Sequence, residues 1–294
     1  MVSGWDRSVR VLTSRGWDVA VAEFQDRWPE AVVASLLINR SYTPELLEVR
    51  GRDGCRMYGM PVAGADHHGL WRSMRSTCAP HGWWPVLTSA DPEKVANGPR
   101  FVDQSSQQVL AEAEAYPPGS IFDEMIDCQG PLFDFGNWWD GLVDEVPSVA
   151  ALAEHIDDRG PVGFRNAIAT DMDRWVGWLY LVPMAGHDIP ALLGLPGTPN
   201  WDWHEWQGRT GQLSLADHVR VLRSWHQRYG ADLVFASFNA LLLAVRHPPV
   251  DSVDVARVAL EQYGYCYDLD QYIGNVDDVA RNQVRTDRWY FWWD

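Results

Sequence analysis

The chain has 294 residues, 46% of them hydrophobic, so it is long enough for one large or two moderate domains and too apolar for general disorder. Its 24 basic and 40 acidic residues give a net charge of −16, which argues against nucleic acid as a direct ligand because phosphate contacts need clustered Lys and Arg. No run approaches the ~18 apolar residues of a membrane span, and residues 1–7 lack an apolar signal core. We therefore expect a cytoplasmic protein without membrane contact.

The negative charge is concentrated in one segment. Residues 91–160 hold 15 Asp and Glu against Lys94, Arg100 and Arg159, which places −12 of the −16 charges there. This segment is either a solvated surface or a docking face for a basic protein partner.

The sequence contains no motif for a common enzyme class or cofactor. The four cysteines lie far apart and form no CxxC pair, which favours reduced thiols. Asp66-His67-His68 is the most metal-like cluster, but adjacent histidines on a helix point apart and no distant ligand is evident. We find no nucleophile elbow, phosphate loop, dinucleotide fingerprint, zincin helix or kinase set. We therefore predict neither a metal nor a cofactor.

Residues 1–90 are expected to form an N-terminal α+β half. Asp66 can cap a helix from His67 to about Thr77, and Gly82 breaks the chain before a strand. The segment 31–38 is ambiguous between helix and buried strand. Apolar runs predict strands over 19–24, 46–50, 56–62 and 84–87.

Residues 91–165 form an acidic, loop-rich connecting segment in this prediction. Seven prolines punctuate it, and helices are expected only over 107–116 and 148–155. Long loops in a compact chain are either functional or linkers, so we place the boundary between the halves here.

Residues 166–294 show a clearer pattern. A buried strand is predicted over 175–182, and Ser214 with Asp217 should form a capping box for a helix that Gly230 ends. A hairpin over 232–237 and 240–246, a helix after Asp251 or Ser252, a short helix near 276–284 and a terminal strand follow. This order predicts a ferredoxin-like (split βαβ) sandwich packed against the N-terminal half.

The terminal strand is apolar on both faces. Trp289, Phe291 and Trp293 alternate with Tyr290 and Trp292. In the ferredoxin-like arrangement this strand lies at a sheet edge, where an exposed apolar strand promotes aggregation. We expect the first half or a second subunit to cover it.

Several stretches resemble a known family. They are Gly177–Pro183, Leu193-Gly194, Gly197 to Asn200, Leu222–Ala231, Glu261–Asp268 and Trp289–Asp294. Together they are similar to the bacterial proteins grouped as domain of unknown function 4253, over about residues 175–294, and Gly82–Leu87 resembles an earlier stretch of the same family. Tyr267 stands where similar proteins tend to have proline. The resemblance implies shared architecture and no reaction type.

Seventeen tryptophans suggest either core packing or an aromatic-lined cleft. A cleft between the halves would bind a small aromatic or polar ligand. The candidate ligand-binding residues lie in predicted loops and one predicted helix: Asn200, Trp201, His204, Trp225, Asp268 and Gln271. The simpler alternatives are that His204 sits in a turn anchoring Trp rings, that Asp268 is a cap, and that His226 packs or hydrogen bonds. Cys266 beside carboxylates is not an activated nucleophile.

Two main functional hypotheses follow, and the sequence leaves open whether the protein is an enzyme. The first is a non-catalytic, immunity-like interaction or regulatory protein that binds a basic partner through residues 91–160. The second is a small-molecule-binding protein or enzyme with the cleft described above. An oligomeric scaffold using the C-terminal strand is a third.

Overall fold

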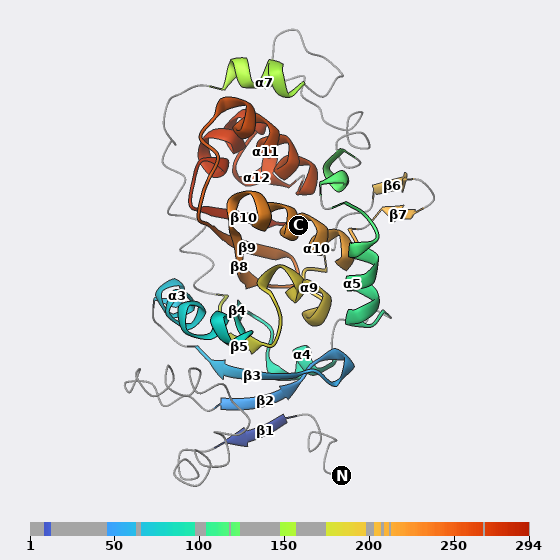
Figure 1. Ribbon diagram of the computed structural model, residues 1–294, viewed down its shortest axis with the longest axis vertical. Helices are drawn as coiled ribbons and strands as arrows, with labels where there is room; N and C mark the ends of the chain where they lie inside the picture. The colour runs from blue at the N-terminus through green and yellow to red at the C-terminus, as the bar shows by residue number, and fades with distance from the viewer. Residues whose placement is uncertain are drawn as a thin grey trace.

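The computed structural model describes residues 9–12, 46–62, 66–97, 104–117, 119–123, 148–156, 175–197, 203–206, 209–211, 213–266 and 268–293. These residues form an α+β fold around one mixed sheet of eight strands, stacked along the long axis of the molecule (Figure 1). The strands are β1 Val9–Leu12, β2 Leu46–Arg50, β3 Arg56–Pro61, β4 Trp84–Thr88, β5 Trp178–Val182, β8 Ala231–Ala236, β9 Ala240–Val245 and β10 Arg288–Trp292. A separate two-stranded sheet pairs β6 Trp203–Trp206 with β7 Arg209–Gly211.

The strand order is β1-β2-β3-β5-β4-β8-β9-β10. β4 pairs with β8 in parallel through Leu87 and Phe235, and the other pairs in this sheet are antiparallel. β4 of the predicted first half thus lies between two strands of the predicted third segment. One hydrophobic core cluster includes residues from all three predicted segments, while the division at 90 and 165 stays a prediction.

The α+β class is confirmed, but the observed order differs from the split βαβ order. A ferredoxin-like sheet would place β9 between β5 and β8 and would pair β10 with β5. Instead β4 lies between β5 and β8, and β10 pairs with β9, where Trp289 lies opposite Leu243. All five residues of β4 are buried, so this strand needs partners on both of its edges.

The longer helices begin and end near the residues that local signals predict, whereas α4 Pro92–Asn97 lies where no helix was expected and α9 Ile189–Leu193 and α12 Leu269–Tyr272 were not predicted. Ser214 and Asp217 form the capping box of α10, and Gly230 ends that helix with a φ of 63°. Asp66 caps α3 and Asp251 caps α11. The helices are α3 His67–Cys78, α4 Pro92–Asn97, α5 Ser106–Glu114, α7 Val149–His155, α9 Ile189–Leu193, α10 Leu215–Tyr229, α11 Ser252–Tyr265, α12 Leu269–Tyr272 and α13 Val276–Val279, with shorter helical turns η3 Arg52–Gly54, η4 Ala79–His81, η7 Gly186–Asp188 and η8 Ala280–Val284.

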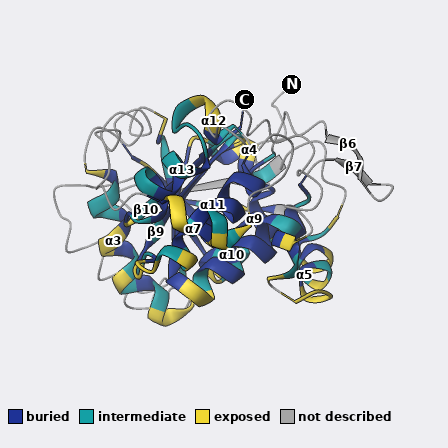
Figure 2. Ribbon diagram, turned by 90° about the horizontal axis from the view of Figure 1, so that it is seen from above, coloured by how far each residue is buried: buried dark blue, intermediate teal, exposed yellow. Residues whose placement is uncertain are grey.

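The C-terminal aromatic residues are buried structure, as predicted. Trp225 of α10 stacks on Phe291 with 5.2 Å between ring centroids and meets Trp289 edge-on at 5.4 Å. Tyr265 of α11 completes this group against Trp293 at 5.3 Å. Figure 2 shows the buried residues gathered along the middle of the molecule and exposed ones on outer helices such as α5. This aromatic cluster fixes α10 and α11 against the edge of the sheet.

Among the described residues, the outer edge of β10 is covered by side chains from Cys266, α12 and η8, a role that the sequence analysis assigned to the first half or a second subunit. The Tyr272 hydroxyl accepts from the Trp292 backbone N at 3.0 Å, and Gln283 Oε1 accepts from the Tyr290 backbone N at 2.9 Å. Cys266 Sγ donates to the Trp292 carbonyl at 3.2 Å. These side chains satisfy backbone groups that an open edge would expose.

The predicted strand at 19–24 and the ambiguous segment 31–38 lie outside the described residues. Among the residues that the structure does describe, every helix is too short or too polar to cross a membrane.

Candidate functional site

The six predicted ligand-binding residues do not form one described site. Trp225 is fully buried in the aromatic cluster, where its Nε1 donates to Glu261 at 2.9 Å. Gln271 and Asp268 do lie together, because Gln271 Nε2 donates to Asp268 Oδ1 at 2.9 Å. His204 is described only as backbone of β6, and the remaining two, Asn200 and Trp201, lie outside the described residues.

A different group of polar side chains converges on Asp232, the second residue of β8. Its side chain is only 3% exposed, and three cationic or basic groups contact it. Arg75 of α3 pairs with Oδ2, Arg246 Nε lies 3.5 Å from the same oxygen, and His226 Nδ1 lies 2.9 Å from Oδ1. Three neighbouring segments of residues 226–246 and the distant Arg75 of α3 therefore meet at one buried carboxylate.

A tight turn brings His226 and Asp232 together. Gly230 ends α10 in the left-handed conformation, so the last turn of the helix and the start of β8 are adjacent. A Cβ at Gly230 would lie 2.9 Å from Arg246 Nε, so glycine also lets this arginine reach Asp232.

His187 of η7 lies beside His226, with 4.8 Å between the ring centroids and 48° between the planes. The preceding Gly186 packs on Trp84, since a Cβ there would lie 2.4 Å from the ring. Burial lowers the pKa of His187 from its ordinary value, and the nearby His226 and Arg223 lower it further, whereas Asp188 and Asp232 act in the opposite direction. His187 is therefore neutral at pH 7.

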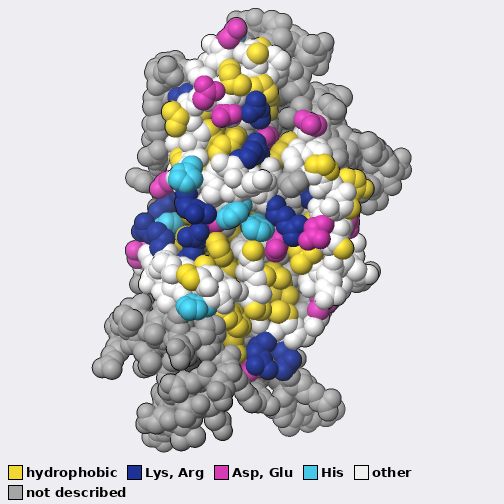
Figure 3. All heavy atoms as spheres, in the orientation of Figure 1, with side chains coloured by type: hydrophobic (Ala, Val, Ile, Leu, Met, Phe, Trp, Pro, Cys, Tyr) yellow, Lys and Arg dark blue, Asp and Glu magenta, His cyan; other side chains and the backbone are white. Residues whose placement is uncertain are grey.

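Arg223 and Asp188 flank the other side of the histidine pair. Arg223 Nε donates to Asp188 Oδ1 at 2.8 Å, and Asp188 Oδ1 lies 3.9 Å from His187 Nε2. Figure 3 shows the result as a band of Arg and His side chains across the middle of one face of the molecule. We call the residues Arg75, His187, Asp188, Arg223, His226, Asp232 and Arg246 the histidine–arginine cluster.

The geometry suits proton exchange with an external group. A carboxylate only accepts hydrogen bonds, so the Asp232 contact places a proton on His226 Nδ1. The His226 side chain is 32% exposed, and no hydrogen bond of its Nε2 is found among the described residues. Among the described residues, no three His, Cys, Asp or Glu side chains are placed to hold a metal ion, and Asp66 acts as the cap of α3.

The sequence analysis identified His226 as a packing or hydrogen-bonding residue and missed its neighbours. Its hydrogen bond to Asp232 confirms the second of these roles. The signal for Asp232 was available: it comes two residues after Gly230, whose role as the helix end was predicted correctly. His187, Arg75 and Arg246 had no comparable local signal.

Comparison with known proteins supports the predicted resemblance for the C-terminal region. Residues 182–294 match the model of the family described as domain of unknown function (DUF4253). The match spans His187, His226, Asp232 and Arg246, whereas Arg75 of α3 precedes it. No curated protein and no solved structure matches the chain.

Proposed function

We propose that this chain, whose residues 182–294 carry a DUF4253 domain, binds a small molecule at the histidine–arginine cluster and exchanges a proton with it through His226. The carrying observation is the 2.9 Å contact between His226 Nδ1 and the nearly buried Asp232. A carboxylate on one ring nitrogen fixes the ring orientation and leaves the other nitrogen to accept a proton. His226 thereby has the geometry of a general acid or base.

The number of groups around Asp232 supports a role beyond structure. One cation suffices to compensate one buried carboxylate, yet Arg75, Arg246 and His226 all contact this one. The cluster also lies where α3 and β4 of the predicted first half meet η7, α10 and β8. A small-molecule site between the halves is thus retained as a hypothesis, but with different residues from those predicted from sequence.

A charge-diverse library of small metabolites tests this proposal, with ¹³C–¹H spectra of the histidine rings as the readout. Binding compounds should shift the ring signals of both His187 and His226, and His226→Gln should abolish binding by removing the proton-exchanging nitrogen. His81→Gln is the matched control, because His81 is exposed and lies at the end of η4. Compounds that bind without moving either ring signal, or no binding compound at all, would contradict the proposal.

The second candidate is a cytoplasmic, immunity-like interaction protein that binds a basic partner. Its support is the charge of residues 91–160, with 15 acidic against 3 basic side chains. Affinity purification should recover a basic protein in a salt-sensitive manner. Replacing Glu112 and Glu114 on α5 and Asp123 by lysine should weaken the capture of this partner. Capture that changes neither with salt concentration nor with this charge reversal would reject the candidate.

A further inference from the structure

We infer that the ligand of the histidine–arginine cluster is a phosphate monoester whose phosphoryl group contacts Arg246 and His226. This inference rests on the small-molecule site proposed above and names the chemical class of its ligand. It follows from the unused donors of Arg246, the local charge, and the number of acceptors that the site can engage.

The guanidinium of Arg246 has hydrogen-bond donors that no described residue uses. Its Nε approaches both Asp232 Oδ2 and the Gly230 carbonyl at 3.5 Å, and its side chain is 52% exposed. No hydrogen bond of its terminal amino groups is found within the described part of the chain. A guanidinium with two free parallel donors is suited to bind two oxygens of an oxyanion.

The charge around Asp232 favours an anion although the chain as a whole carries −16. Arg75 and Arg246 bring two positive charges to one carboxylate, which leaves one in excess. On the other side of the histidine pair, Arg223 pairs with Asp188 and with the exposed Glu114, so the excess positive charge is confined to the surroundings of Asp232. An incoming anion therefore meets an uncompensated positive charge at Arg246, and protonation of His226 would add a second.

The acceptor count distinguishes a phosphate from a carboxylate. A carboxylate offers two oxygens, so one that engages both terminal amino groups of Arg246 can reach His226 only by sharing an oxygen between two donors. The phosphoryl group of a monoester offers three, so that one remains for a proton on His226 Nε2. Its second ionisation lies near pH ~6, so the bound monoester can itself accept or release a proton near neutral pH.

Calorimetric titration of the full chain with matched compounds tests this inference. The probes are phenyl phosphate, inorganic phosphate, benzoate and benzyl alcohol. We expect phenyl phosphate to bind, benzoate to bind at least about tenfold more weakly, and benzyl alcohol not to bind, since a charge-assisted hydrogen bond corresponds to roughly this factor. Arg246→Gln should weaken phenyl phosphate binding about tenfold or more.

Arg257→Gln is the control for Arg246→Gln. The Arg257 side chain is 48% exposed and pairs with Asp254 on α11, whereas Arg246 is 52% exposed. This variant should leave phenyl phosphate binding unchanged. Thermal unfolding of both variants checks that each remains folded, and a second variant, Arg246→Lys, keeps the charge while removing the parallel donors.

The outcomes separate this inference from the proposed function. Equal binding of benzoate, or phenyl phosphate binding that survives Arg246→Gln, would overturn the phosphate assignment while leaving the site itself in place. Inorganic phosphate binding as tightly as phenyl phosphate would overturn the ester and indicate the free anion. If none of the four probes binds but a compound of the metabolite library shifts the His226 signal, only the ligand class is wrong. If neither the probes nor the library compounds bind, both the phosphate assignment and the proposed function are wrong.

Discussion

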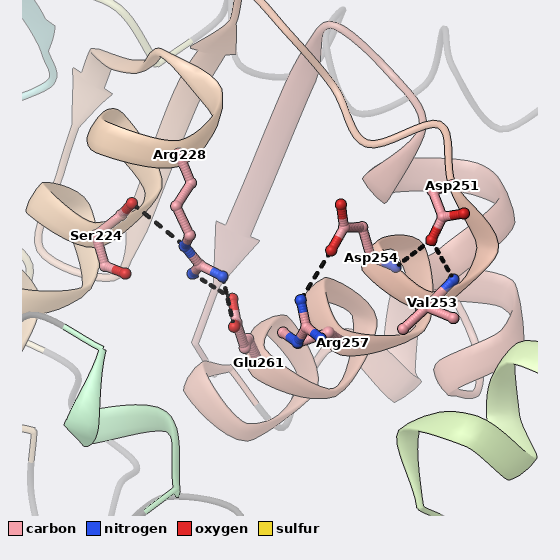
Figure 4. Close-up of polar contacts among 7 residues, drawn as sticks. All are labelled: Ser224, Arg228, Asp251, Val253, Asp254, Arg257 and Glu261. Atoms are coloured by element: carbon pink, nitrogen blue, oxygen red, sulfur yellow. Dashed lines mark hydrogen bonds and ion pairs between the residues drawn. The ribbon is translucent and has the colours of Figure 1, made fainter.

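Arg228 of α10 and Glu261 of α11 form a bidentate ion pair with N–O distances of 2.8 and 2.6 Å (Figure 4). The Glu261 side chain is 4% exposed, and its Oε2 also accepts from Trp225 Nε1 at 2.9 Å. A single carboxylate therefore joins the two helices that cover the C-terminal aromatic residues and fixes the central tryptophan.

Removing the arginine of this pair should destabilise the protein strongly. Arg228→Ala leaves the Glu261 charge buried without its partner, and we expect a loss of about 3 kcal/mol in the free energy of unfolding, the low end for buried pairs because Arg228 is itself 31% exposed. Arg257→Ala breaks an exposed pair on the same face of α11 and should cost at most about 0.5 kcal/mol. Chemical denaturation measures both. Equal losses would show that burial does not determine the strength of the Arg228 pair.

The covering of the β10 edge by Tyr272 gives a second prediction. Tyr272→Phe removes the hydroxyl that accepts from the Trp292 backbone N at 3.0 Å. A partly buried N–H loses its only described acceptor, so we expect a loss of about 1–2 kcal/mol in the free energy of unfolding. Hydrogen exchange at the Trp292 amide should also become faster.

Tyr116→Phe is the control for this experiment. Tyr116 is 44% exposed, and no hydrogen bond of its hydroxyl is found among the described residues, so neither stability nor exchange at Trp292 should change. Unchanged exchange in Tyr272→Phe would mean that the hydroxyl does not protect the edge.

A buried histidine should make stability depend on acid pH. His218 is fully buried, its Nδ1 lies 2.6 Å from the Tyr265 hydroxyl, and burial lowers its pKa to about 3. In the unfolded chain the pKa of histidine is about 6.5. Between these values the unfolded state binds more protons, so the contribution of His218 is complete above pH ~6.5 and is lost as the pH falls toward 3.

His218→Gln should remove this contribution, because glutamine can still hydrogen bond to Tyr265 without titrating. The slope of the unfolding free energy against pH, measured between pH 6 and 4 by denaturation, should decrease by up to about 1.4 kcal/mol per pH unit. His81→Gln replaces an exposed histidine and should leave the slope unchanged. An identical slope in His218→Gln would show that His218 takes up its proton equally in both states.

Local signals predicted the longer helices but missed α4, α9 and α12, whereas the sheet and the site depend on distant contacts. The Ser214–Asp217 capping box and the helix end at Gly230 require only neighbouring residues, and both are confirmed. The place of β4 between β5 and β8 depends on pairings across more than 90 residues, such as Val86 with Tyr180, which no local pattern encodes.

The same reason explains why most of the histidine–arginine cluster was missed. His226 and Asp232 are close in sequence, but Arg75 reaches them only because β4 places α3 beside the start of β8. The abundance of tryptophan favoured an aromatic cleft, yet Trp225 serves the core. Polar groups that converge from distant segments cannot be identified before the strand order is known.

Gly186 offers a test of how the fold positions His187. A Cβ at Gly186 would lie 2.4 Å from the Trp84 ring, and that ring is fixed because its Nε1 donates to the Leu233 carbonyl at 3.1 Å. Gly186→Ala must therefore move η7, and we expect a loss of about 1–3 kcal/mol in the free energy of unfolding, as for other overpacked sites.

Gly177→Ala is the matched control, because its Cβ would meet nothing within 4 Å and it should change stability by less than about 1 kcal/mol. The ring signals of His187 supply a readout specific to the site. Movement of η7 exposes this ring, so its pKa, which burial lowers, should rise toward the ordinary value of about 6.5 in Gly186→Ala and stay low in Gly177→Ala. An unchanged pKa in Gly186→Ala would show that the contact with Trp84 does not position His187.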